Sequence, residues 1–411
     1  MLNCGCTRQR SKGNMARIEG TDSIKTVKRV ATVCLVMLAL PGFCMGQGAS
    51  SSSASTASHP PKARINWTEF HRPGMARWNP YETTLNVHNV GQLGLKWSYF
   101  TFGGDFSSPA VVDGVLYFGS EDYTVYGLNA STGARLWNYA TGFYVHSSPA
   151  VKNGVMYIGS ENWNVYGINA RSGAKLWNYT TGSGVWSSPV VANGVVYAGS
   201  GDKKVYALNA RTGAKLWSYK TGGLVLSSPA VARGVVYVGS YDKSLYALDA
   251  RTGAKLWNFP TGRHIFSSPT VTNGVVYIGS WDKNVYALNA RTGAKLWSYA
   301  TGDAIESSAA VANGVVYVGS DDNNLYALDA KSGAKLWSFP TGFEVVSSPA
   351  VANGVVYVGS WDGNIYALDA GTGAMLWSDA VGSAVSSSPV VVNGVVYVGS
   401  DGGYVYAFGL N

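Results

Sequence analysis

The fold of this chain is decided by a 40-residue stretch, residues 187–226, which reads SSPVVANGVVYAGSGDKKVYALNARTGAKLWSYKTGGLVL. Close copies recur along the chain at a constant spacing of 40 residues, and two markers, a Ser-Ser pair and a Trp, each occur eight times in register. The pairs begin at 107, 147, 187, 227, 267, 307, 347 and 387, and the Trp series is Trp97, Trp137, Trp177, Trp217, Trp257, Trp297, Trp337 and Trp377. A fixed period near 40 residues is typical of repeat architectures.

Each unit contains four predicted strands. The first, SPVVANG in the quoted unit, ends at an Asn-Gly pair, which suits the two-residue turn of a hairpin. The second, GVVYAGS, is rich in β-branched residues, and the third, KVYALNA, alternates apolar with other positions. The fourth, AKLWSY, follows a Thr-Gly turn. Four antiparallel strands per repeat predict an all-β fold, an eight-bladed β-propeller.

The two ends of the repeat predict how the ring closes. Trp97 lies in a fourth strand, within residues 92–106, that precedes every complete unit, whereas the last unit, from Ser387, ends after its third strand. The N-terminal strand is therefore expected to complete the last blade, which hides sheet edges that would otherwise aggregate. The first strands are expected to be sheet edges facing the axis, where the Pro that begins seven of them is tolerated. The eight Trp residues are expected to dock structurally against the next blade.

The N-terminal segment predicts export. Lys25, Lys28 and Arg29 precede a short apolar run, Val30 to Phe43, and small residues follow, which is the layout of a signal peptide over residues 1–46. The apolar run is shorter than a bilayer-spanning helix requires. Translation that starts at Met15 would shorten the charged part. A lipid anchor at Cys44 is disfavoured because bulky Phe43 precedes it. Residues 47–65, rich in Ser, Ala and Pro, predict a flexible tether to a propeller over residues 66–411, with residues 66–91 as a lead-in.

Charge and cysteine content exclude several classes of function. The formal charge of +8 is concentrated in residues 1–46, which leaves 24 basic against 21 acidic residues and no basic stripe for nucleic acid. All four cysteines (Cys4, Cys6, Cys34, Cys44) also lie in that segment. The exported chain is thus expected to have no disulfide, no thiol nucleophile and no cysteine-ligated metal. We predict a monomer without a membrane span, located in the periplasm or secreted.

The repeat resembles a known family. The run from Ala207 to Trp217, ALNARTGAKLW, is similar to the tryptophan-docking motif of PQQ-like β-propeller repeats, and Asn89 to Leu93 before Trp97 resembles the start of the first blade of quinoprotein dehydrogenases. The resemblance covers residues 92–411. It implies the quinoprotein alcohol dehydrogenase-like superfamily, which comprises enzymes with PQQ and Ca²⁺ and BamB-like outer-membrane assembly proteins. Because the fold hosts unrelated functions, the resemblance leaves both open.

Differences between the repeats are concentrated in two loops. One joins the fourth strand to the next first strand (residues 143–146 and equivalents), and the other joins the second to the third strand (residues 121–123 and equivalents). Both are expected on the same face, and exposed loops on a rigid scaffold commonly carry binding residues. The alternative is drift where packing constrains the repeats least. The candidate binding residues are Tyr144, His146, Trp163, Trp186, Tyr241, His264, Trp281, Glu306, Glu344 and Trp361.

The sequence favours binding over catalysis, with no catalytic residue and no metal ligand assigned. A quinoprotein dehydrogenase requires a calcium site, a carboxylate base and a cradle for the quinone. The family's vicinal cysteine pair and long inter-blade insertions are missing here, and the carboxylates of the variable loops (Glu121, Glu161, Glu306, Asp321, Glu344 and Asp401) are scattered over the blades. The leading hypothesis is an exported, cofactor-free, BamB-like scaffold that binds envelope or extracellular proteins. The alternatives are a PQQ- and calcium-dependent dehydrogenase and a carbohydrate-binding or structural module.

Overall fold

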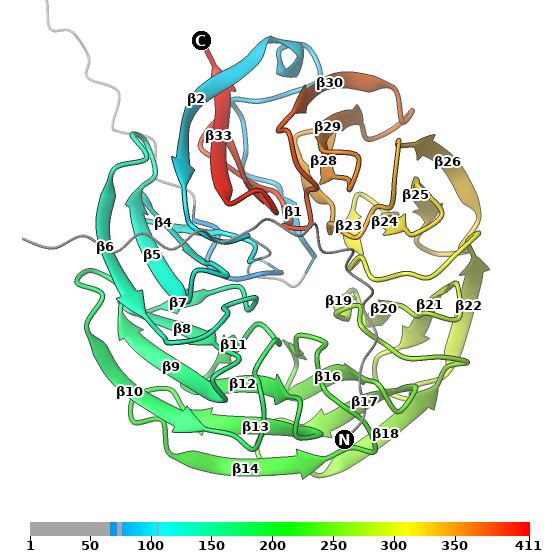
Figure 1. The fold of residues 1–411 in the computed structure, drawn as a ribbon. Coiled ribbons are helices and arrows are strands. Elements are labelled where there is room, and N and C mark those ends of the chain that lie inside the picture. The colour runs from blue at the N-terminus through cyan, green and yellow to red at the C-terminus, as the bar shows by residue number, and fades with distance from the viewer. Residues whose placement is uncertain (1–65, 72–75, 105–106) are drawn as a thin grey trace, which may run out of the picture. The chain divides into compact units, whose positions relative to one another are not determined.

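The computed structural model describes residues 66–71, 76–104 and 107–411, and the predicted signal peptide and tether lie outside this range. The described residues confirm the all-β, eight-bladed β-propeller (Figure 1). Each blade is a sheet of four antiparallel strands that runs from the axis to the periphery. The one helix in the described part is a single 3₁₀ turn, η1 (Val90–Gln92), and no described helix could cross a membrane.

The strands of the eight blades follow the chain. Blades 1 to 4 are β3 (Ala110–Val112), β4 (Val115–Gly119), β5 (Thr124–Asn129), β6 (Arg135–Ala140); β7 (Ala150–Lys152), β8 (Val155–Gly159), β9 (Asn164–Asn169), β10 (Lys175–Thr180); β11 (Val190–Ala192), β12 (Val195–Ser200), β13 (Lys204–Asn209), β14 (Lys215–Lys220); and β15 (Ala230–Ala232), β16 (Val235–Ser240), β17 (Ser244–Asp249), β18 (Lys255–Pro260). Blades 5 to 8 are β19 (Thr270–Thr272), β20 (Val275–Gly279), β21 (Asn284–Asn289), β22 (Lys295–Ala300); β23 (Ala310–Ala312), β24 (Val315–Ser320), β25 (Asn324–Asp329), β26 (Lys335–Pro340); β27 (Ala350–Ala352), β28 (Val355–Gly359), β29 (Asn364–Asp369), β30 (Met375–Ala380); and β31 (Val390–Val392), β32 (Val395–Ser400), β33 (Tyr404–Leu410), completed by β2 (Leu93–Phe100).

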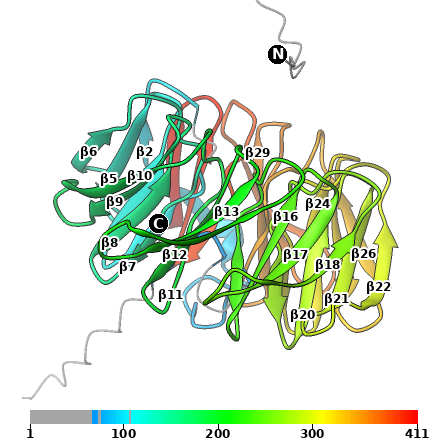
Figure 2. The ribbon, with the colours of Figure 1, turned by 90° about the horizontal axis from the view of Figure 1, so that it is seen from below.

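Local sequence explains the blades. The Asn-Gly pairs form the tight turns between first and second strands, and in blade 3 Asn193 and Gly194 have φ of 50° and 77°, which suits a two-residue hairpin. The second strand is almost fully buried in every blade because sheets cover both of its faces. Figure 2, turned by 90°, shows the strands running between the two faces of the propeller.

The Trp series links each blade to the next. The indole N–H of Trp217 donates to the carbonyl oxygen of Ala250 in the following blade, at 3.0 Å, and six other members of the series make the same bond. Gly253, at φ 76°, lies against this ring, where a Cβ atom would come within 2.7 Å of it. At the end of the series Trp377 donates to Leu93 across the closure.

The ring is closed by the predicted N-terminal strand. In blade 8, β2 pairs antiparallel with β33, and the register places Trp97 opposite Ala407. A circle of hydrogen bonds near the axis crosses the same junction, because the second Ser of each Ser-Ser pair donates its backbone N–H to the equivalent hydroxyl of the next blade. Ser388 completes the circle by donating to Ser108 at 2.9 Å.

The lead-in runs around the axis on the inner strands, which the sequence did not predict. We call residues 66–71 and 76–92 the belt. Backbone carbonyls of the belt accept hydrogen bonds from the central Val of four first strands, for example from Val151 to Thr68 at 2.7 Å and from Val351 to Arg77 at 3.0 Å. The strand β1 (Trp78–Asn79) adds a fifth, parallel strand to blade 7 beside β27. The expectation that the first strands are sheet edges facing the axis is therefore wrong for β27, which β1 covers, whereas β3, β7 and β23 are the edges of their four-stranded sheets. The belt gives buried backbone groups of these edges hydrogen-bond partners.

Arg77 is the most heavily bonded residue of the belt. It is fully buried, and its guanidinium donates to the carbonyl oxygens of Phe70, Pro349 and Pro389, at 2.5, 2.8 and 2.9 Å. It also lies over the rings of Trp67 and Phe70, with 5.6 and 4.8 Å to their centroids. Burial lowers the pKa of Arg77 from its usual value. A single side chain thus joins blades 7 and 8 to the belt.

Candidate binding rim of the variable face

The two variable loops of neighbouring blades contact each other, as expected for loops on one face. Between blades 1 and 2, the backbone N–H of Glu161 donates to the carbonyl oxygen of Tyr144 at 3.0 Å, and in the connection from blade 2 to blade 3 the N–H of Val185 donates to the carbonyl oxygen of Ser160. The third position of the first loop, as at Val145, is fully buried against a strand glycine. The residues that differ between the repeats are therefore mainly those whose side chains point away from these shared backbone bonds and buried contacts.

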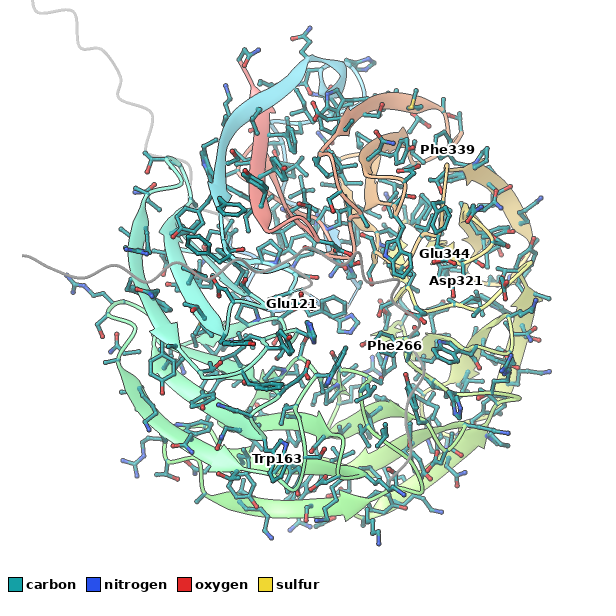
Figure 3. The ribbon with its side chains drawn as sticks, in the orientation of Figure 1. Glu121, Trp163, Phe266, Asp321, Phe339 and Glu344 are labelled. Atoms are coloured by element: carbon teal, nitrogen blue, oxygen red, sulfur yellow. The ribbon has the colours of Figure 1, made fainter. Side chains whose placement is uncertain are left out.

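Part of the variable positions forms what we call the axial rim. It consists of the first residue of the second loop and the second or fourth residue of the first loop, and its members are Glu121, His146, Glu161, Trp186, Tyr241, His264, Phe266, Trp281, Glu306, Asp321, Glu344, Trp361, Ser386 and Asp401. Figure 3 shows Glu121 and Phe266 near the axis of the propeller, and Asp321 and Glu344 near one another. Trp163, in contrast, lies toward the periphery.

His146 joins the loops of blades 1 and 2. Its Nε2 lies 2.9 Å from Oε1 of Glu121 and its Nδ1 lies 2.5 Å from Oε1 of Glu161, while its ring lies 4.3 Å from that of Trp186. Burial alone would lower the pKa of His146, but the two carboxylates outweigh it and raise the pKa to about 9. The imidazolium is therefore held between two carboxylates, which are consequently not available as a pair for a metal ion.

Aromatic side chains make up the part of the rim in blades 4 and 5. Tyr241 stacks on His264 with 4.9 Å between centroids, and it also lies 5.9 Å from Trp281 and 6.5 Å from Phe266. The imidazole Nδ1 of His264 hydrogen-bonds the carbonyl oxygen of Tyr241. This cluster brings three of the predicted site residues together, and it adds Phe266.

Three carboxylates follow in blades 5 to 7. Burial raises the pKa of Glu306 to about 7, and the nearby charge of Glu344 acts in the same direction. Burial likewise raises the pKa of Asp321 to about 7, with further repulsion from Glu306 and Glu344. Burial and the charge of Asp303 raise the pKa of Glu344 as well. These shifts show that carboxylates which looked scattered in the sequence are electrostatic neighbours in the fold.

The rim continues into blade 8 through hydrogen bonds. Trp361 Nε1 donates to the hydroxyl of Ser386 at 2.9 Å, and this hydroxyl donates to Asp401 at 2.9 Å. Burial raises the pKa of Asp401 to about 6. The hydrogen bonds from Ser386 act to lower this pKa, and the charge of Glu121 acts to raise it further. Trp361 is 39% exposed, as is Trp186 across the rim. The rim is thus acidic and aromatic, with two exposed indole rings.

The predicted site residues do not form one site. Tyr144 contacts both groups, since its ring stacks 5.9 Å from that of His146 and also meets the peripheral pair Tyr123 and Phe143. Trp163 is 53% exposed at a position with φ 74°, the peripheral tip of its loop. Sequence reasoning left Phe266, Asp321 and Asp401 outside the site, although their positions within the loops match those of other rim residues.

A quinone with calcium does not fit this rim. Calcium requires six to eight oxygen ligands, yet Glu121 and Glu161 are engaged by His146. Across residues 66–71, 76–104 and 107–411, no group of three His, Cys, Asp or Glu side chains is placed to hold a metal ion. The remaining carboxylates are buried near one another, since burial and, to a smaller extent, the charges of their neighbours raise the pKa values of Glu306 and Asp321, and they would also repel an anionic quinone.

Comparison with known proteins identifies a matching family and solved structures with a similar fold. A family model described as "Outer membrane protein assembly factor BamB" matches residues 94–200, 140–229, 164–303 and 282–410. BamB from Moraxella catarrhalis is 20% identical, with a TM-score of 0.68 over 77% of this chain and 99% of that chain. The quinohemoprotein alcohol dehydrogenase ADHIIG from Pseudomonas putida HK5 is 19% identical, with a TM-score of 0.74 over 84% and 80%. A europium-containing methanol dehydrogenase is 16% identical, with a TM-score of 0.71 over 84% and 98%. No curated protein sequence matches the chain.

Proposed function

This chain belongs to the family of the outer membrane protein assembly factor BamB, and on that premise we propose that it is an extracytoplasmic, non-catalytic scaffold that binds other envelope proteins through its axial rim. The observation that carries the proposal is the contrast between eight near-identical blades and one rim whose combination of residues changes from blade to blade. Rigid scaffolds commonly present binding residues on such loops. The family and the predicted export segment support the location.

The chemistry of the rim defines the kind of partner. Exposed Trp residues are frequent hot spots of protein interfaces, and Trp186 and Trp361 offer two such rings. Carboxylates at Glu306, Asp321 and Glu344 favour a partner segment that carries Lys or Arg, because a cation would relieve their mutual repulsion. Both features suit a basic segment with apolar anchor residues.

A cross-linking experiment with matched variants tests the proposal. The protein, displayed in the envelope, is cross-linked and its partners are identified by mass spectrometry, and the affinity for the main partner is then measured with purified components. We expect Trp186→Ala with Trp361→Ala to weaken binding about tenfold or more. The control is Leu216→Ala with Leu256→Ala, since these leucines are 51% and 52% exposed on the outermost strands. Equal loss in both variants, or none in either, contradicts a role for the rim.

The likeness to quinoprotein dehydrogenases makes catalysis the second candidate. Titration with PQQ and Ca²⁺, followed by dye reduction with alcohols, tests it directly. We expect no stoichiometric quinone absorbance and no turnover. Saturable quinone binding with alcohol-dependent dye reduction would replace the scaffold proposal by an enzyme.

A further inference from the structure

A small cavity lies between the belt and blades 3 and 4. Its lining comes from three consecutive residues of the belt and from the starts of β11 and β15, and it consists of Glu69, Phe70, His71, Ser188, Pro189, Val190, Ser228 and Pro229. The volume of this cavity is about 10 Å³. This volume corresponds to a single water molecule.

The imidazole of His71 is a buried polar group that lacks hydrogen-bond partners. The residue is only 3% exposed, and neither Nδ1 nor Nε2 has a hydrogen-bond partner among the residues that the structure describes. Burial lowers the pKa of His71 to about 3, and the charge of Arg77 acts in the same direction, so the ring is neutral at ordinary pH. A neutral imidazole has one N–H donor and one acceptor nitrogen, and leaving both unsatisfied in the interior is costly.

Other polar groups around the cavity are suited to bind water. The Glu69 carboxyl accepts a hydrogen bond from the backbone N–H of Val191 and has further acceptor capacity. The hydroxyl oxygens of Ser188 and Ser228 accept the N–H bonds of the Ser circle at 2.9 Å, so each hydroxyl hydrogen can donate toward another group. A water molecule here would have the two to four polar partners that buried waters typically have.

We propose that the cavity binds one water molecule that bridges His71 and Glu69 and fastens the belt to blades 3 and 4. The position explains its role. In the described part of the belt, backbone hydrogen bonds join Thr68 to blade 2 and Ala76 to blade 6, and the Glu69 carboxyl bonds to blade 3 through Val191. The water adds the contact that the imidazole of His71 lacks, and so strengthens the attachment of the belt at blades 3 and 4.

The first test is a high-resolution crystal structure of the unaltered protein. We expect one peak of water density within hydrogen-bond distance of a His71 ring nitrogen and of the Glu69 carboxyl. An empty cavity, or density that contacts neither group, overturns the proposal. This measurement does not depend on whether any variant folds.

The second test is His71→Phe, because the wet and the dry cavity predict opposite signs. If water binds, the variant removes a partner from a satisfied network, and the folding equilibrium constant falls about fivefold or more. If the cavity is dry, the variant removes two unpaired polar atoms and stabilises the protein, which overturns the proposal. The control is His88→Phe in the same segment, where the imidazole is exposed and no change is expected.

Discussion

The two ends of the propeller axis are built in opposite ways. At one end the belt is a single-copy segment whose polar groups are buried and bonded to several blades, as Arg77 and Asn79 show. At the other end the rim uses repeated loop positions, but with a combination of side chains that changes from blade to blade and with two Trp residues 39% exposed. The eight near-identical blades thus form a common scaffold. The differences around the axis come from the belt, which lies outside the repeat, at one end and from a few loop positions at the other end.

The comparison predicts that substitutions in the belt affect stability and substitutions at the rim mainly affect binding. Arg77→Met should have the largest effect, a loss of about 3–5 kcal/mol, because two buried carbonyl oxygens and one partly buried carbonyl oxygen lose their donor. Urea unfolding measures it. Arg211→Met, at an exposed turn, is the control and should change stability by less than about 0.5 kcal/mol. Similar losses for both would show that the belt is not specially stabilising.

The pH dependence of the free energy of unfolding distinguishes a titrating group in the belt from one at the rim. Burial raises the pKa of Glu69 to about 7, above its model-compound value of 4.5, so the fold favours the neutral carboxyl. The contribution of Glu69 is therefore most favourable below pH 4.5 and is lost as the pH rises from 4.5 through 7, by about 3 kcal/mol at most. Unfolding at several pH values should show this slope, and Glu69→Gln should remove it. A slope that persists in Glu69→Gln would assign it to another group.

At the rim, His146 changes the stability of the fold at higher pH than Glu69 does. Its pKa rises from 6.5 to about 9 in the fold, where the carboxylates of Glu121 and Glu161 outweigh burial. The stabilisation by the imidazolium is therefore complete below pH 6.5 and is lost as the pH rises through 9, by about 2 kcal/mol. His146→Gln should flatten stability between pH 6.5 and 9. NMR titration of the imidazole checks the pKa directly, and a value near 6.5 would contradict the ion pairs.

Substitutions of the docking Trp residues in the blades should lower the stability by similar amounts in every blade. Trp217→Phe keeps most of the apolar ring but removes the indole N–H bond to Ala250, so a loss of about 1 kcal/mol is expected. Trp137→Phe and Trp297→Phe break the equivalent bonds and should cost nearly the same in calorimetry. A spread among the three of more than about 1 kcal/mol would show that the blades are not energetically equivalent.

The smallest effect is expected within the acidic part of the rim. Asp321→Asn removes a charge that Glu306 and Glu344 repel, so stability at pH 8 should increase by about 0.5 kcal/mol. The control is Asp362→Asn, since Asp362 accepts bonds from Tyr366, Asn364 and Gly342 and should be destabilised on substitution. If Asp321→Asn also destabilises, the carboxylate has a structural partner rather than a free role at the rim.

Sequence predicted the frame better than the site for a physical reason. Hairpin turns, strand alternation and the docking Trp depend on residues that are near in sequence or exactly one repeat apart, so they are visible as a period. The rim depends on which side chains of neighbouring blades meet, as Glu121 and Glu161 meet at His146. The loops that vary were visible in the sequence, but the separation of Trp163 from the axial residues was not.

The sequence by itself determined eight blades, four strands in each and a closure by the strand around Trp97, because these follow from periodicity and from an incomplete last unit. Only the tertiary structure showed that residues of the belt bond to the inner strands around the axis. Arg77 bonds to residues 272 and 312 positions away, and such contacts exist only once the ring has brought blades 7 and 8 back to the lead-in. Burial inside that ring then sets the protonation of Glu69 and His71, which no local pattern of residues could show.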